Sequence, residues 1–169
     1  MSPRTAIARN HVVLLAIFIL SACQTHLPAP THSTASLSSA IESSTMTHTS
    51  QSNFTETNAR LKAAIESRGL TVFAIVDHAA GAAKVDQTLA PNTLYIFGNP
   101  KAGTPLMLAN PALGLELPLK ANVREENGQV LVTVSDIRAI TAAAGVTEPA
   151  QVINNIAAAL DAIATEAAG

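Results

Sequence analysis

One stretch in the second half of the chain constrains the fold more than any other. Residues 117–136 read "LPLKANVREENGQVLVTVSD", in which apolar Leu119, Ala121 and Val123 alternate with polar side chains. After Asn127-Gly128 the alternation resumes on the return strand, at Val130, Val132 and Val134. Asn-Gly favours a two-residue turn in which both residues have positive φ. The stretch therefore predicts a β-hairpin with one apolar face.

The remaining elements alternate between helical and extended patterns. The apolar runs at residues 70–77 and 93–97 are nearly continuous, which predicts strands covered on both faces. Helices are predicted at 53–69, 79–89, 104–110, 136–144 and 149–169. This order predicts one α+β domain, with a small sheet of about four strands that contains antiparallel pairs and is packed with helices.

The N-terminal 23 residues have the pattern of an export signal. Arg4 and Arg9 precede the apolar run at residues 12–20. The next residues, Leu20-Ser21-Ala22-Cys23, resemble the lipobox of bacterial lipoproteins, in which the cysteine is lipidated before cleavage. The resemblance implies a signal peptide over residues 1–23 and a membrane anchor at Cys23. Because Gln24 and not Asp follows, it also implies a cell-envelope location at the outer membrane, facing the periplasm.

Composition excludes several classes of partner and of chemistry. Cys23 is the only cysteine, so the domain forms no disulfide and has no thiol chemistry once that residue is lipidated. The formal charge is −2 and no cluster of Lys or Arg is present, so nucleic acid is not an expected partner. The pattern contains no cofactor motif and no cluster of metal ligands, so we expect neither.

Residues 24–52 are rich in Ser and Thr and have almost no apolar periodicity. Such a segment buries too little apolar surface to offset its ordering entropy, which predicts a flexible tether. Three irregularly spaced histidines lie in it, His26, His32 and His48, and a metal-binding tail is the alternative to solvated linker residues. We therefore expect residues 53–169 to fold without the segment that precedes them.

The loop Gly98-Asn99-Pro100-Lys101-Ala102-Gly103-Thr104 has glycines spaced almost as in a phosphate-binding loop. Thr104 stands where that motif requires a lysine, and Pro100 removes one backbone amide. Lys101 is at the wrong place in the loop to replace the missing lysine. The loop is therefore not expected to bind a nucleotide.

Three segments together resemble the domain of unknown function 302 family. They are "RLKAAIESRGLTVFAIVDHAAGA", "LYIFGNPKAGTPLMLANP" and the hairpin segment, in this order. The resemblance covers about residues 54–146 and implies a small α+β fold without an established activity. It places the domain at 53–146, and it leaves the signal, the tether and an amphipathic helix at 147–169 outside.

The candidate site residues follow two strands of this domain. They are Asp77, His78, Gly98, Asn99, Pro100 and Thr104. We expect the ends of the two strands to bring them together beside an apolar pocket that binds a small ligand or a protein partner. The alternatives are helix caps and turn geometry, an envelope hydrolase or isomerase using His78 and Asp77, and a structural homodimer. We assign no catalytic residue, and binding is favoured over catalysis.

Overall fold

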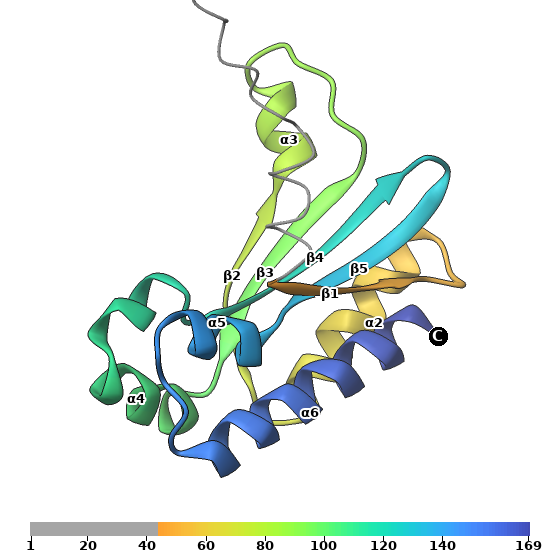
Figure 1. Ribbon diagram of the computed structural model, residues 1–169. Coiled ribbons are helices and arrows are strands. Elements are labelled where there is room, and N and C mark those ends of the chain that lie inside the picture. The colour runs from red at the N-terminus through yellow and green to blue at the C-terminus, as the bar shows by residue number, and fades with distance from the viewer. Residues whose placement is uncertain (1–43) are drawn as a thin grey trace, which may run out of the picture. The chain divides into compact units, whose positions relative to one another are not determined.

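A five-stranded sheet organises the protein in the computed structural model, which describes residues 44–169 (Figure 1). Its strands are β1 (Thr45–Thr49), β2 (Thr71–Asp77), β3 (Asn92–Gly98), β4 (Leu119–Glu126) and β5 (Gln129–Ser135). They lie in the order β1-β5-β4-β3-β2, and all neighbours are antiparallel. The predicted α+β class is confirmed, with five strands in place of about four.

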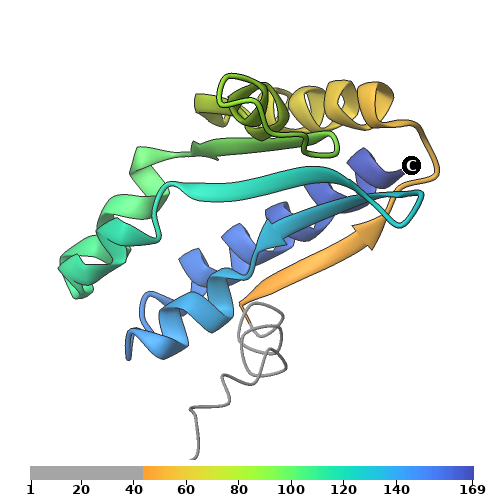
Figure 2. The same ribbon diagram turned by 90° about the horizontal axis from the view of Figure 1, so that it is seen from above.

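The helices are α2 (Phe54–Glu66), α3 (His78–Ala83), α4 (Pro100–Ala109), α5 (Ile137–Ala143) and α6 (Ala150–Ala168), with a 3-10 turn η1 (Pro111–Leu115). In Figure 1, α2 and α6 run beside each other along one face of the sheet. Figure 2, turned by 90°, places α4 and the first turns of α6 at the same end of the sheet, as Figure 1 does. Among residues 44–169, no helix has the length and apolar character needed to cross a membrane.

The predicted hairpin is formed by β4 and β5. Asn127 and Gly128 both have positive φ, 51° and 77°, and the strands begin to pair at Glu126 and Gln129. Because side chains alternate between the two faces of a strand, the apolar set points to the helices. Val123, Val132 and Val134 are at most 1% exposed. The polar set, which includes Asn122, Arg124 and Thr133, lies on the opposite face.

The core fills the space between this sheet face and the two long helices. Leu61 and Ile65 from α2 are fully buried, as are Ile163 and Ala164 from α6. Phe97 of β3 is the bulkiest fully buried side chain of the described residues. The small side chains of α6, Ala157, Ala164 and Ala167, let that helix approach α2 and the sheet closely. Packing of small aliphatic side chains therefore holds the domain without any disulfide.

The segment predicted as a tether contains a strand, so the tether boundary at residue 52 is wrong. β1 pairs with β5 along its whole length, from Thr45 opposite Ser135 to Thr49 opposite Leu131. Met46 packs against the core, and Nε2 of His48 lies 3.9 Å from Oδ1 of Asp161 on α6. His48 is thus part of the sheet and not of a linker. Cys23, His26 and His32 lie outside the described residues.

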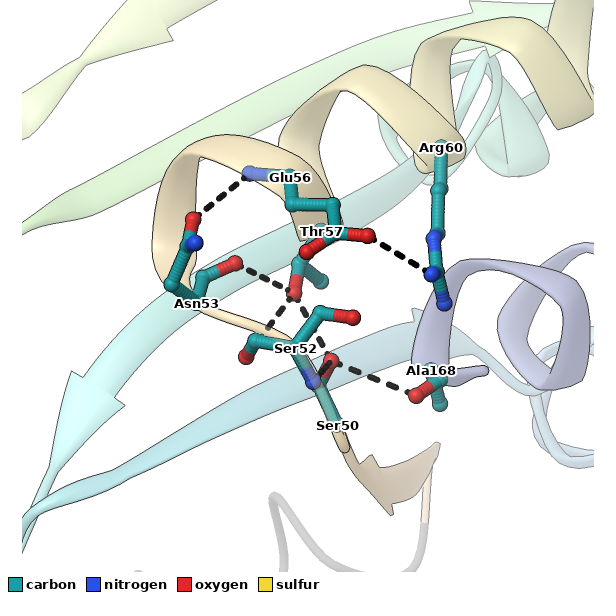
Figure 3. A network of polar contacts seen from close by, with 7 residues as sticks. All are labelled: Ser50, Ser52, Asn53, Glu56, Thr57, Arg60 and Ala168. Carbon is teal, nitrogen blue, oxygen red and sulfur yellow. Dashed lines mark hydrogen bonds and ion pairs between the residues drawn. The ribbon is translucent and has the colours of Figure 1, made fainter.

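The connection from β1 to α2 is also tied to the domain (Figure 3). The hydroxyl groups of Ser50 and Thr57 lie 2.7 Å apart, and Thr57 is fully buried. Ser50 also donates to the carbonyl of Ala168 at 3.3 Å, and the amide of Gln51 donates to the same carbonyl at 2.8 Å. These contacts join the start of α2 to the last turn of α6. The ordered domain therefore extends to residues well before 53.

The last helix belongs to the same domain, which corrects the boundary placed at residue 146. On the apolar side of the predicted amphipathic helix, now α6, Leu160 and Ile163 are buried, whereas Val152 and Ile156 are half-buried. Arg68, just after α2, forms a 2.9 Å ion pair with Glu166 on α6. Because α6 covers β5 and β1 as well as α2, its removal would uncover buried apolar side chains of these elements.

β2 is an edge strand, so the expectation that both its faces are covered is wrong. Phe73, Ile75 and Val76 are 51%, 48% and 38% exposed, respectively. The pairing with β3 shifts register between Val72 and Ala74, which marks a bulge at Phe73. Bulges of this kind are frequent at sheet edges, where they redirect a side chain. At Phe73, the redirected ring lies against the cavity described below.

Candidate binding cavity

The Gly98–Thr104 loop is the start of a helix. β3 ends at Gly98, and the side chain of Asn99 caps α4 by accepting a 2.9 Å hydrogen bond from the amide of Lys101. Pro100 occupies the first helical position, where its missing N–H costs nothing. Gly98 does not have positive φ, so its backbone conformation does not require a glycine. The loop is thus built as a strand-to-helix connection.

Asp77 and His78 lie at the other end of the same strand pair. Because β2 and β3 are antiparallel, Asp77 pairs with Thr93, and Gly98 pairs with Thr71. Six residues of extended chain separate the two ends, a distance of about 20 Å. The expectation that these residues converge with Asn99 on one site is therefore wrong. It assumed that the two strands end at the same edge, as parallel strands do.

Asp77 caps a helix, which was the structural alternative to a role in ligand binding. Its carboxylate accepts a 2.8 Å hydrogen bond from the amide of Ala80 and caps α3. His78 follows it and is exposed. Figure 1 shows α3 far from α4, at the opposite end of β2. The two predicted loops are therefore separate, and the Asn99 loop adjoins the cavity described below, which Asp77 and His78 do not line.

The cavity has a volume of about 320 Å³ and lies between α4, α6 and the end of the sheet. Four of the predicted site residues line it: Gly98, Asn99, Pro100 and Thr104. The other lining residues come from the start of β2, from the end of β3, from α4, from the approach to β4 and from α6. They are Leu70, Phe73, Phe97, Ala102, Gly103, Met107, Leu117, Pro118, Leu119, Asn155, Ile156, Ala159, Leu160 and Ile163.

The buried part of the cavity lining is apolar, and its exposed part is polar but uncharged. Phe97, Leu160 and Ile163 are at most 1% exposed and form the inner wall. The only polar side chains on the lining, Asn99, Thr104 and Asn155, are exposed and uncharged. No Asp, Glu, Lys, Arg or His lines the cavity. This combination of an apolar wall and a few exposed polar groups is typical of small-molecule sites.

The contribution of α6 to the cavity could not be predicted from the sequence. Asn155, Ile156, Ala159, Leu160 and Ile163 recur at helical spacing, which indicates a face turned to the core. A sequence pattern of this kind does not distinguish a face that packs fully from one that borders a void. That difference depends on how α4 and the chain around Leu117 close the end of the sheet.

The described residues offer little for acid–base or metal chemistry at this cavity. Within residues 44–169, no three His, Cys, Asp or Glu side chains lie close enough to hold a metal ion. Burial raises the pKa of the Tyr95 phenol above its ordinary value, so this group is neutral over the physiological range. Tyr95 faces the helices, its hydroxyl is 3.5 Å from the carbonyl of Asn58, and it does not line the cavity. The arrangement is suited to binding.

Comparison with known proteins identifies the family. The family model described as "Domain of unknown function DUF302" matches residues 46–166. The chain belongs to the DUF302 family. The DUF302 match begins within β1 and ends within α6, so it includes both elements that sequence analysis placed outside the domain.

Two curated relatives of this DUF302 protein come from Brucella. The protein named "Fluoride-specific ion channel FluC 1" from Brucella suis biovar 1 (strain 1330) is 42% identical over 101 residues, which are 59% of this chain and 40% of the relative. The protein of the same name from Brucella abortus biovar 1 (strain 9-941) has the same identity over 37% of its length. The chain thus spans about two fifths of the length of these relatives.

A solved structure shares the DUF302 fold. It is a crystal structure of an uncharacterized conserved DUF302 protein from Bacillus stearothermophilus, with a TM-score of 0.66. The superposition covers 73% of this chain and 97% of that protein, at 18% sequence identity. At this identity the comparison supports the fold alone.

Proposed function

We propose that this protein is a lipid-anchored component of a bacterial envelope whose DUF302 domain binds a small molecule without transforming it. The observation that carries the binding function is the apolar cavity of about 320 Å³ beside the Asn99 loop. An engineered apolar cavity of about 150 Å³ is already large enough to bind benzene. The channel activity in the name of the Brucella relatives is not part of this proposal, because the match covers about two fifths of each.

The envelope location rests on the sequence of residues 1–23, which lie outside the described part of the chain. Changing Cys23→Ser removes the only thiol that can accept a lipid. We expect the variant to incorporate no labelled palmitate in a bacterial host and to accumulate as unprocessed precursor, whereas the parent protein is labelled. Equal labelling of both proteins, or labelling of neither, would contradict the anchor.

The binding function is tested by the heat unfolding of residues 24–169 in the presence of uncharged apolar compounds. Benzene, indole and n-octanol form the smallest useful set. A compound that binds only the folded state at ten times its Kd stabilises that state by about 1.4 kcal/mol. For a domain of this size the unfolding midpoint then rises by about 3–6 °C. If no compound of the set raises the midpoint up to its solubility limit, the proposed function is wrong.

The enzyme alternative has less support from the described residues. It required His78 and Asp77 to act around the Asn99 loop, and the antiparallel register separates these groups by the length of β2. The carboxylate of Asp77 is also engaged as the cap of α3. The dimer alternative has exposed apolar side chains on β2 in its favour, and nothing in the structure shows what covers them.

A further inference from the structure

The cavity described above follows α6 for about two turns. The lining residues of this helix run from Asn155 to Ile163, eight residues apart. At a rise of 1.5 Å per residue they span about 12 Å. A volume of about 320 Å³ corresponds to about ten groups of the size of a water molecule, which is the size of one alkyl chain.

The chemistry of the wall also varies along the cavity. Phe97, Leu160 and Ile163 are buried and provide no hydrogen-bonding side chain at the inner wall. Asn99, Thr104 and Asn155 are exposed and can hydrogen-bond a ligand at the opening. The side-chain oxygen of Asn99 already accepts from Lys101, and that of Asn155 accepts from Gln151, which leaves their NH2 groups for a ligand. Thr104 adds a hydroxyl that can donate or accept.

Charge on the ligand is disfavoured by the same lining. A charged group that enters an apolar cavity loses its hydration, and this cost is recovered only when an opposite charge lies beside it. None of the lining side chains is charged. Lys101 follows Pro100 but is exposed and is not part of the lining. A carboxylate drawn into the cavity with its chain therefore meets no opposite charge on the lining, whereas an uncharged polar group does not need one.

We infer that the cavity binds an uncharged amphiphile with a single alkyl chain, the chain lying along α6 and a hydroxyl, ester or amide head at Asn99, Thr104 or Asn155. This inference rests on the proposed function and names the ligand class of the same site. A methylene group occupies about as much volume as a water molecule in the liquid, about 30 Å³. The cavity therefore accommodates a chain of about eight to ten carbons.

The test is a calorimetric titration of residues 24–169 with linear primary alcohols of increasing length, from butanol to dodecanol. Each buried methylene strengthens binding about fourfold, from about 0.8 kcal/mol per group. We expect this gain for every carbon up to octanol or decanol, and then a plateau when the chain outgrows the cavity. We also expect octanoate to bind at least tenfold more weakly than octanol.

Two further compounds distinguish failure of this inference from failure of the proposed function. Benzene and indole are uncharged and apolar but have no chain. If they bind while the affinity of the alcohols does not depend on length, the alkyl-chain inference is overturned and the cavity remains a ligand site. The same conclusion follows if octanoate binds as tightly as octanol. If none of these compounds binds, both the inference and the proposed function fall.

Discussion

Removal of β1 should destabilise the domain severely. A chain of residues 53–169 loses the whole pairing of β1 with β5 and the hydrogen bonds that Ser50 and Gln51 make to Ala168. It also loses Met46 from the core. Each buried hydrogen bond contributes about 0.5–1.5 kcal/mol, so several of them with one apolar side chain amount to at least about 4 kcal/mol. This is a large part of the 5–15 kcal/mol that is usual for a whole domain.

Urea denaturation of three chains measures this effect. Residues 24–169 are the reference, residues 44–169 keep β1, and residues 53–169 lack it. We expect the first two to have similar midpoints and the third to unfold at much lower urea or to aggregate, because the free edge of β5 can pair with other chains. If residues 53–169 match the reference, β1 is dispensable and the original boundary at residue 53 is restored.

Elements whose structure is fixed by neighbouring residues were predictable from sequence. The β4–β5 hairpin followed from alternation and from Asn127-Gly128, because turn and strand pattern specify the same register. The start of α2 was predicted near residue 53, and the side chain of Asn53 caps it by accepting from the amide of Glu56 at 3.0 Å. In both cases the decisive contacts join residues close in sequence, so the pattern contains the information.

Elements whose structure depends on distant partners were not predictable in the same way. β1 reads "TMTHT", and only the edge of β5, more than eighty residues away, makes it a strand. Its threonines pair with polar groups on the open face, as in the 2.9 Å contact between Thr47 and Thr133. A composition rich in Ser and Thr was interpreted as a tether because a lone segment of this kind buries too little.

Four of the six candidate site residues line the cavity, whereas Asp77 and His78 do not. The Asn99 loop was correctly expected to adjoin an apolar pocket, since Gly98, Asn99, Pro100 and Thr104 line the cavity. The pairing of this loop with Asp77 and His78 failed, because the direction of β2 relative to β3 is a long-range property that the two apolar runs do not encode. The role of α6 also required the packed structure. An amphipathic helix was predicted there, but not that Ala159 and Leu160 line a cavity.

Partial filling of the cavity should abolish most of its binding. Ala159 lines the cavity, whereas its neighbour Ala158 is exposed and does not. Ala159→Leu adds three carbons, or about 90 Å³ of the 320 Å³ available. Ala158→Leu makes the same chemical change, with the same small effect on helix propensity, on the solvent side. Filling an existing void commonly stabilises a domain by about 0.5–2 kcal/mol, so Ala159→Leu should remain folded.

The measurement that tests the central claim most directly is a calorimetric titration of n-octanol into the parent chain and these two variants. If the cavity between α4, α6 and the sheet is the ligand site, Ala159→Leu binds at least tenfold more weakly and Ala158→Leu binds as the parent does. Heat unfolding of each protein without octanol establishes that both variants are folded. An affinity of folded Ala159→Leu within twofold of that of Ala158→Leu would show that octanol binds elsewhere, and the cavity would no longer be the site.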